Sequence, residues 1–451
     1  MTATTVVAAA LQRDRRPAAY DWLEALADRG TLVVDPVRAT PVITAVARVC
    51  GKRVYAFAMD AAAAAGAMTD TAADAVATLI DAAREAGAPV VGLWESAGAS
   101  VRVGPPALGG LGRLFSAQVR ASGVVPQVSV VMGAAAGGAA YGPALSDIVI
   151  AAPEARMFLT GPKIVHAAIG EVVDADTLGG TSVHAARSGL MHVVANSRLD
   201  AVATARKVVD LLARRWTLPA TEPDVPGGPA LPASPRRAYD VRLVIERILD
   251  GDPRPVYLHD RWARNIVTAL GRIQGRSVGV VANNPIRLAG CLDGTASDKA
   301  ARFVRMCDGL GVPLIVLVDV PGFLPGARQE TDGVIRRGAK LVHAFAAAEV
   351  PRFTVVMRKA YGGAFIAMNS KSLGADRVLA WPCADIGVMS GATATLLTGA
   401  EPEQPSERIL AAAVADGLID EVIPLEATRA RLAELLERTP ARAGRQRNIQ
   451  L

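Results

Sequence analysis

The sequence has 451 residues, a length that fits two domains of ordinary size better than one. Its net charge of +6 is moderate and only 4% of its residues are aromatic, which argues against a protein that stacks nucleic-acid bases in a basic groove. The positive charge indicates an arginine-rich solvated surface, or attraction of an anionic substrate such as a phosphate-bearing thioester. The apolar fraction of 51% is enough for a sizeable core in each domain.

The cysteine pattern bears on metal binding and on the redox compartment. No two of the four cysteines form a C-x-x-C pair, so no zinc site is predicted, and we expect no other metal site. Isolated cysteines among apolar neighbours predict reduced thiols in a cytoplasmic protein. The uncharged run at 121–146 is interrupted by prolines and glycines, which favours a strand, a turn and a buried helix over a membrane span.

Helical and strand-like segments alternate along the first half of the chain. Apolar residues at helical spacing predict helices, and short β-branched runs predict strands. The fully apolar run at 90–94 is typical of a buried parallel strand. The predicted helices are 18–29, 70–86, 109–121 and 201–215, and the predicted strands are 31–34, 41–48, 53–58, 90–94 and 125–132. This alternation predicts an α/β sheet with crossover helices.

A cluster of prolines and glycines at 219–235 follows the helix predicted at 201–215. Such a cluster at mid-chain is typical of a linker between domains. We therefore predict an N-terminal domain over 1–225 and a C-terminal domain over 236–451.

The second half of the chain repeats the first. Gly137-Gly138-Ala139 recurs as Gly362-Gly363-Ala364, and the strand-like runs before the two triplets align at the same offset of 225 residues. The segment 311–319 matches 87–95 at an offset of 224, which also places Gly322 on Gly98, and 376–382 matches 147–153 at 229. Three blocks at nearly one offset predict an internal duplication of one fold.

Each half carries two small-residue turns that follow strands. Ala97-Gly98 and Gly137-Gly138 are the first pair, and Gly322-Phe323 and Gly362-Gly363 are the second. Glycine allows close approach and positive φ, and a helix that begins at such a turn exposes free N–H groups. Two converging N–H groups form an oxyanion hole. The alternative is tight helix–sheet packing, but four turns repeated in one order favour the functional interpretation.

No side-chain constellation suggests another chemistry. The sequence has no H-E-x-x-H and no phosphate-loop lysine, and its five histidines are scattered. A reaction that needs oxyanion holes and brings its own base would fit this pattern.

Specific motifs recur along nearly the whole chain, at 126–144, 158–162, 178–181, 282–285, 289–292, 299–305, 319–326, 335–341, 358–364 and 447–451. Through these motifs the sequence resembles a known family, the β subunits (carboxyltransferases) of biotin-dependent acyl-CoA carboxylases. The likeness is strongest to actinobacterial acetyl- and propionyl-CoA carboxylase β chains.

The resemblance implies two tandem crotonase-like (ββα-spiral) domains and a carboxyl transfer from carboxybiotin to an acyl-CoA. The biotin, carried by a biotin carboxylase/carrier α subunit, would take the α-proton, and the enolate would attack CO₂. The cofactors are then biotin and coenzyme A thioester, and the assembly a dimer-based homo-oligomer, a hexamer. In the family, CoA binds the N-terminal domain of one subunit and biotin the C-terminal domain of its neighbour.

The resemblance also implies roles for single residues. The thioester oxyanion falls to Ala97, Gly98 and Gly138, next to Gly137, and the biotin ureido oxygen to Gly363 and Ala364, next to Gly362, with Phe323 on the same side. Ile366 stands where propionyl-preferring members carry Asp, which favours acetyl-CoA and leaves propionyl-CoA open.

Three departures from the family pattern leave two other functions open. Ala97 and Ser100 replace a glycine and an arginine of the family's Ser-Gly-Gly-Ala-Arg turn, Lys163 stands where an acid is expected, and the segment that follows Met389 is short. The alternatives are a biotin-independent acyl-CoA decarboxylase on the same scaffold and a non-catalytic subunit of a carboxylase complex.

Overall fold

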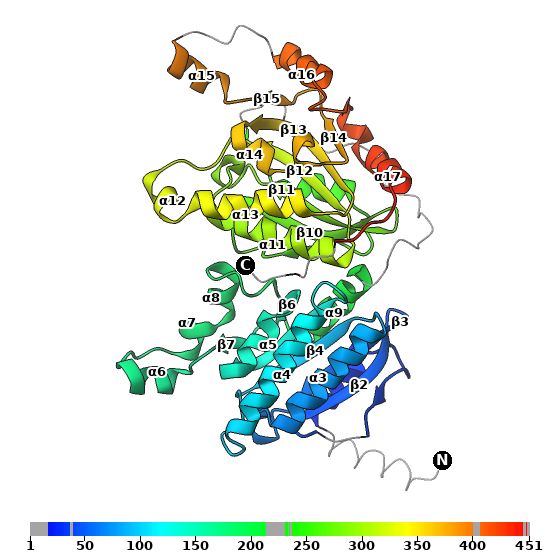
Figure 1. Cartoon of the computed structure of the whole chain (residues 1–451), viewed down its shortest axis with the longest axis vertical. Helices are drawn as coiled ribbons and strands as arrows, with labels where there is room; N and C mark the ends of the chain where they lie inside the picture. The colour runs from blue at the N-terminus through cyan, green and yellow to red at the C-terminus, as the bar shows by residue number, and fades with distance from the viewer. Residues whose placement is uncertain are drawn as a thin grey trace. The chain divides into compact units, whose positions relative to one another are not determined.

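The computed structural model describes residues 17–36, 39–212, 231–232, 234, 237–399, 406–444 and 448. The chain divides into two compact units, Met1–Ala213 and Arg214–Leu451. Each unit contains an eight-stranded sheet with helices packed against it (Figure 1). The linker predicted at 219–235 lies outside the described residues apart from 231, 232 and 234, so the predicted limits of the domains stay a prediction.

Unit 1 begins with an antiparallel part and continues as a parallel sheet. Its path is β1-β2-β3-β4-β5-β6-β8, and β7 pairs with β5. The strands are β1 (Val33–Val34), β2 (Val42–Val49), β3 (Lys52–Met59), β4 (Val90–Ser96), β5 (Gln127–Ala136), β6 (Ile148–Ala151), β7 (Arg156–Phe158) and β8 (Val193–Val194). The helices are α2 (Ala18–Leu26), α3 (Asp70–Glu85), α4 (Pro105–Ala121), α5 (Tyr141–Ala144), α6 (Pro162–Ile169), α7 (Ala175–Gly179), α8 (Thr181–Ala186) and α9 (Arg198–Leu212).

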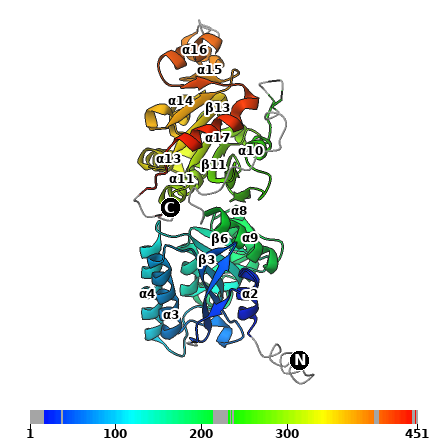
Figure 2. The ribbon, with the colours of Figure 1, turned by 90° about the vertical axis from the view of Figure 1, so that its right-hand side faces the viewer.

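The helices of unit 1 cover both faces of its sheet. Figure 2 shows α3 and α4 side by side on one face and α2 with α9 on the other. The α3–α4 layer is close-packed because Gly110 lies against α3, where a Cβ would stand 2.7 Å from the Asp70 Cα. A parallel strand covered on both faces needs apolar residues throughout, which explains the uninterrupted run in β4.

Unit 2 repeats this arrangement with the path β16-β14-β13-β12-β11-β10-β9, and β15 pairs with β13. The strands are β9 (Val256–Leu258), β10 (Ile266–Ile273), β11 (Arg276–Asn283), β12 (Leu314–Val320), β13 (Arg352–Tyr361), β14 (Arg377–Ala380), β15 (Asp385–Gly387) and β16 (Glu421–Val422). The helices are α10 (Arg242–Ile248), α11 (Gly294–Leu310), α12 (Ala327–Thr331), α13 (Val334–Ala347), α14 (Gly362–Ala367), α15 (Gly391–Thr398), α16 (Ser406–Ala415) and α17 (Thr428–Arg438).

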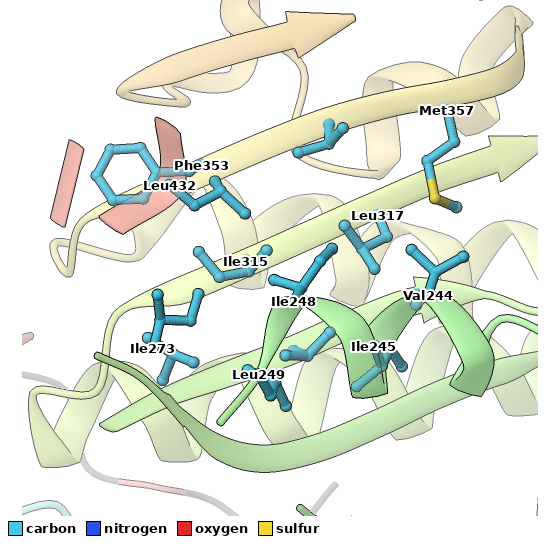
Figure 3. Close-up of a cluster of buried hydrophobic side chains, with 14 of the residues drawn as sticks. Val244, Ile245, Ile248, Leu249, Ile273, Ile315, Leu317, Phe353, Met357 and Leu432 are labelled. Carbon is cyan, nitrogen blue, oxygen red and sulfur yellow. The ribbon is translucent and has the colours of Figure 1, made fainter. Parts of the chain in front are cut away.

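The main core of unit 2 lies between the sheet and two helices that come from opposite ends of the unit. Figure 3 shows Ile245 and Ile248 of α10 beside Ile315 and Leu317 of β12, with Leu432 of α17 near Phe353. All of these side chains are buried. Burial of each stabilises the fold by roughly 1.5–3 kcal/mol relative to an exposed position. On the other face of the sheet, α11 packs beside α13 (Figure 1).

The duplication extends to backbone details. In each unit the middle pair of strands carries the same irregularity, with one residue of the first strand opposite three of the second. The register passes from Trp94↔Val131 to Ser96↔Ala135 in unit 1 and from Val318↔Val356 to Val320↔Ala360 in unit 2. A bulge bends and twists a strand, so it aims the end of β5 or β13 and the turn that follows.

None of the helices in the described part of the chain has the length and apolar character that crossing a membrane requires.

Candidate active-site turns

In unit 1 the two predicted turns lie against each other at the carboxyl ends of neighbouring parallel strands. Gly98 follows β4, and Gly137 is the first residue after β5. Their φ angles are +102° and +56°, a region that favours glycine. A Cβ on Gly98 would stand 2.8 Å from the Ala136 carbonyl oxygen, so glycine is required for this close approach.

The second turn offers the N–H group of Gly138. Residues Gly137–Ala140 form a short 3₁₀ helix, and its first hydrogen bonds use the N–H groups of Ala139 and later residues. The Gly138 N–H therefore has no partner within the helix. The structure places Gly138 as the sequence predicts, partly accessible and at the N-terminus of a helical turn.

The first turn differs from the prediction at Ala97. Its N–H donates to the Ala65 carbonyl oxygen at 3.0 Å, so in this conformation it does not face a ligand. The Gly98 N–H donates to the Ser96 Oγ at 3.2 Å, so it too is already hydrogen-bonded within the chain. Sequence reasoning missed Ala99. Its N–H has no acceptor within the described residues. Ala99 forms a bridge with Met68, and this pairing orients its backbone.

The repeat contained the signal that would have found Ala99. Phe323, chosen in the second half, lies 224 residues after Ala99, and both residues occupy the same bridge in their units: Met68 pairs with Ala99 and Leu292 with Phe323. On each side of Phe323, Leu292 accepts from the Leu324 N–H at 2.7 Å and donates to the Gly322 oxygen at 3.1 Å. This pattern turns the Phe323 N–H away from Leu292, as the matching bonds do for Ala99.

In unit 2 the turn after β13 opens a regular helix. Gly362 has φ +57° and begins α14, so the N–H groups of Gly362, Gly363 and Ala364 lie in its first turn and have no intrahelical acceptor. The positive end of the helix dipole adds to their attraction for negative charge. Gly363 is exposed, and among the described residues no atom lies within 4 Å of the position of its absent Cβ.

Apolar side chains lie near both sets of donors along the chain. Beside Gly138 lie Leu111, 2.7 Å from the position of the absent Cβ, and the edge-to-face pair Phe115–Tyr141, whose ring centroids are 6.0 Å apart. Ile366 occupies in unit 2 the repeat position of Tyr141, and each is about half exposed, at 50% and 49%. Such walls lower the local dielectric constant and strengthen hydrogen bonds to a charged oxygen.

Beneath the unit 2 turns lies a buried charged cluster. The Asp319 carboxylate lies 3.5 Å from the Arg358 guanidinium and accepts the Tyr239 hydroxyl at 3.0 Å. Burial raises the pKa of Asp319, although Arg358 opposes this shift. In unit 1 the repeat position holds Glu95, which lies 3.4 Å from Arg198 of α9.

The residues that depart from the family pattern do not prevent the backbone from adopting these turns. Ser100 is buried, and its N–H donates to the Met68 oxygen at 2.8 Å. The segment after Met389 folds as α15.

The described residues contain no group of His, Cys, Asp or Glu that could hold a metal ion.

The duplicated α/β units place the chain in the class of tandem crotonase-like folds, as predicted. The structure superposes on the transcarboxylase 12S crystal structure, described with hydrolysed methylmalonyl-coenzyme A bound, with a TM-score of 0.86 and 36% identity, over 95% of this chain and 91% of that one.

Sequence comparison identifies the family. Residues 24–398 match the carboxyl transferase domain. The chain is 46% identical over 434 residues (91% of each chain) to the biotin-dependent acetyl-/propionyl-coenzyme A carboxylase beta6 subunit of Mycobacterium tuberculosis (strain ATCC 25618 / H37Rv). It is 47% identical over 381 residues (82% of this chain, 79% of the relative) to the propionyl-CoA carboxylase beta chain of Rhodococcus erythropolis. The chain therefore belongs to the carboxyl transferase family, as the motifs predicted.

Proposed function

We propose that this chain is the carboxyltransferase subunit of a biotin-dependent acyl-CoA carboxylase. It moves a carboxyl group from carboxybiotin on a carrier protein to acetyl-CoA, or propionyl-CoA, giving malonyl-CoA or methylmalonyl-CoA. The observation that carries the proposal is the presence, in a member of this family, of a matched pair of turns with free backbone N–H groups in each unit.

The two turn pairs take different tasks in this proposal. The Ala99 and Gly138 N–H groups donate to the thioester oxygen of the acyl-CoA and stabilise the charge that develops there when the α-proton leaves. Losing one such donor typically costs roughly 3–4 kcal/mol of transition-state stabilisation. Ala99 takes the place that the sequence prediction gave to Ala97, while Gly98 and Gly137 allow the close approach of the two turns.

The biotin side is unit 2. The residues fit a ureido oxygen, because Gly363 and Ala364 offer two adjacent N–H groups at the positive end of α14 and Gly363 leaves the space before them open. The Phe323 N–H comes from the neighbouring turn, and Gly362 provides the φ that begins the helix. Carboxybiotin, when bound, supplies the carboxyl group and the base, which explains why no His, Cys or Ser constellation is needed.

The partners follow from the same proposal. The chain works with a biotin carboxylase/biotin carrier α subunit and, like the 12S relative whose structure is described as a hexamer assembly, forms a homo-oligomer. No residue of α6 is buried, and Ile164 and Ile169 are 63% and 73% exposed, an apolar surface that suits a second copy of the chain. The four free cysteines support a cytoplasmic location.

Reconstituted carboxyl transfer tests the function. The purified chain, carboxylated carrier protein and acetyl-, propionyl- or butyryl-CoA are mixed, and the carboxylated product is measured. We expect malonyl-CoA to form fastest, with propionyl-CoA less favoured by no more than about 1–3 kcal/mol, the discrimination that one methylene allows. Loss of CO₂ from malonyl-CoA alone, without carboxylation, would instead support the decarboxylase alternative.

A further inference from the structure

We propose that Asp319 is a positioning residue for carboxyl transfer: its carboxylate ties together the two strand ends that carry the biotin-side N–H donors. The inference rests on the proposed function of unit 2 and adds a residue to it. Asp319 does not reach the reacting atoms, and it acts through the backbone of β12 and β13.

Asp319 lies in the sheet at the bulge between β12 and β13. It is the single residue of β12 opposite the three bulge residues Met357, Arg358 and Lys359 of β13. Four residues after Asp319 comes Phe323, and four residues after Lys359 comes Gly363. After the bulge the two strands share one more pair, Val320↔Ala360, and both donor turns begin just beyond it.

The Asp319 side chain bonds to the bulge backbone and to two other side chains. One carboxylate oxygen accepts the backbone N–H of Lys359 at 3.2 Å, and the other accepts the Tyr239 hydroxyl at 3.0 Å and lies 3.5 Å from Arg358. A bulge leaves backbone groups unpaired, and here a buried side chain replaces the missing partner. The Asp319 side chain is 2% exposed and the Arg358 side chain 7%, so water cannot substitute for either.

The groups around the Asp319 carboxylate are themselves held by further contacts. Arg358 lies over the Tyr239 ring, 5.3 Å from its centroid, and donates to the Arg237 carbonyl oxygen at 3.1 Å. On the other side of β13, residues 359–361 pair with β15, and the Tyr361 hydroxyl bonds Asp385. The end of β13 is thus held on both sides. This fixes the orientation of the N–H groups in the first turn of α14.

The carboxylate at the matching position of unit 1, Glu95, makes different contacts from Asp319. Glu95 at the repeat position leans over the bulge residue Gly133, where a Cβ would stand 2.3 Å from its Oε1, and it pairs with Arg198. No backbone N–H of the unit 1 bulge is bonded by Glu95 among the described contacts. The direct link from carboxylate to bulge backbone belongs to the proposed biotin side.

The test compares Asp319 with a matched residue. Asp250 is also a buried carboxylate, bonded to Arg429 and to the backbone N–H groups of Gln274 and Gly275 at 2.9 and 2.7 Å. Asp250 follows α10 in the chain, and its carboxylate bonds the turn between β10 and β11. This turn is at the opposite end of the parallel strands from the donor turns. Replacing Asp250 should cost similar stability without moving the donor turns.

We measure kcat, the KM for acetyl-CoA, Tm, and hydrogen–deuterium exchange of residues 359–367 in the full-length variants. Asp319→Ala should lower kcat about 100-fold, because small misplacement of catalytic groups has effects of this size. The KM for acetyl-CoA should stay within about threefold, since that substrate is assigned to unit 1. Asp319→Asn should recover about tenfold of kcat, because its amide oxygen can still accept the Lys359 N–H. Exchange at 359–367 should rise in Asp319→Ala and not in Asp250→Ala.

Equal kcat losses in Asp250→Ala and Asp319→Ala, or unchanged exchange in Asp319→Ala, would overturn the positioning role. If Asp319→Ala does not fold, Asp319→Asn and Tyr239→Phe are compared: we expect a larger kcat loss in the first, and equal losses would contradict the proposal. An inactive wild-type chain would refute the proposed function, whereas the exchange result would still report on Asp319 alone.

Discussion

At the scale of residues, the proposed chemistry rests on backbone N–H groups, and the side chains around them mainly allow or orient the backbone. This explains which residues could be predicted. Gly98, Gly137 and Gly362 are marked in the sequence because a positive φ restricts the residue type. Ala99 carries no such mark, because any residue can donate a backbone N–H, and only the bridge to Met68 shows where it points.

Proline substitution distinguishes Ala97 from Ala99. Ala97→Pro should keep carboxyl transfer within about threefold of wild type, because Pro321 occupies the repeat position in unit 2 and the lost bond goes only to Ala65. Ala99→Pro should lower kcat about 10²–10³-fold, the effect of removing one oxyanion donor. Steady-state kinetics with acetyl-CoA as the varied substrate decide between them. A larger loss of kcat in Ala97→Pro than in Ala99→Pro would indicate that Ala97 is the donor.

At the scale of elements, the sequence predicted which segments are helices and strands better than it predicted where they end. The helix expected at 109–121 begins at Pro105, and its Gly109-Gly110 pair lies inside it because Gly110 allows α3 to approach. The strand expected to end at 132 extends to Ala136, because the alanines there pair with β7. The helix expected to reach 29 ends at Leu26, where Ala27 is extended. Tertiary pairing overrides local propensity in the first two cases.

Asp28 connects three elements of unit 1 and gives a pH-dependent prediction. It accepts the Cys50 and Gly51 N–H groups at 3.0 and 2.7 Å and the Arg206 guanidinium of α9 at 2.7 Å. Burial alone would raise its pKa, but the hydrogen bonds from Gly51, Arg206 and Cys50 together hold the pKa below its usual value. The folded state therefore binds the proton on Asp28 less tightly than the unfolded state. The stability that the carboxylate contributes is present above the ordinary aspartate pKa, and it is lost as the pH falls through the lowered pKa of the folded state.

The substitution Asp28→Asn should lower the free energy of unfolding by about 1–3 kcal/mol at pH 7, as expected for a partly buried charge-assisted network. The difference from wild type should shrink once the pH falls below the ordinary pKa of the aspartate. Urea unfolding at pH 7 and in acid measures both. A difference that stays constant with pH would show that the carboxylate charge contributes nothing.

At the scale of the whole molecule, the internal repeat was the strongest sequence signal, and the structure carries it into the bulges and bridges of each unit. The same duplication explains why one sequence offers two sites of one design, which can specialise for different ligands. Assembly could not be predicted from the residue pattern, because a helix with an exposed apolar face such as α6 looks like any amphipathic helix until its burial is known.

The proposed homo-oligomer predicts an effect of Ile164→Glu. Burying this isoleucine against a second copy would contribute roughly 1.5–3 kcal/mol, and an unpaired carboxylate there would cost more. We expect at least about a tenfold weaker assembly with an unchanged Tm of the isolated chain, measured by light scattering over a concentration series. Lys163→Glu, at the exposed neighbouring position, is the control. Identical masses for Ile164→Glu and wild type would place the interface elsewhere.

In the proposed mechanism, backbone N–H groups at the start of α14 stabilise the charge on biotin during carboxyl transfer. Gly363→Pro removes one of them in the first helical turn, where proline is tolerated, and Gly363→Ala keeps the N–H at a position with room for a Cβ. With acetyl-CoA and carboxylated carrier, Gly363→Pro should lose about 10²–10³-fold in kcat, while Gly363→Ala stays within about tenfold of wild type and both keep their acetyl-CoA affinity. Turnover of a folded Gly363→Pro variant equal to wild type would show that this N–H group does not stabilise the charge on biotin.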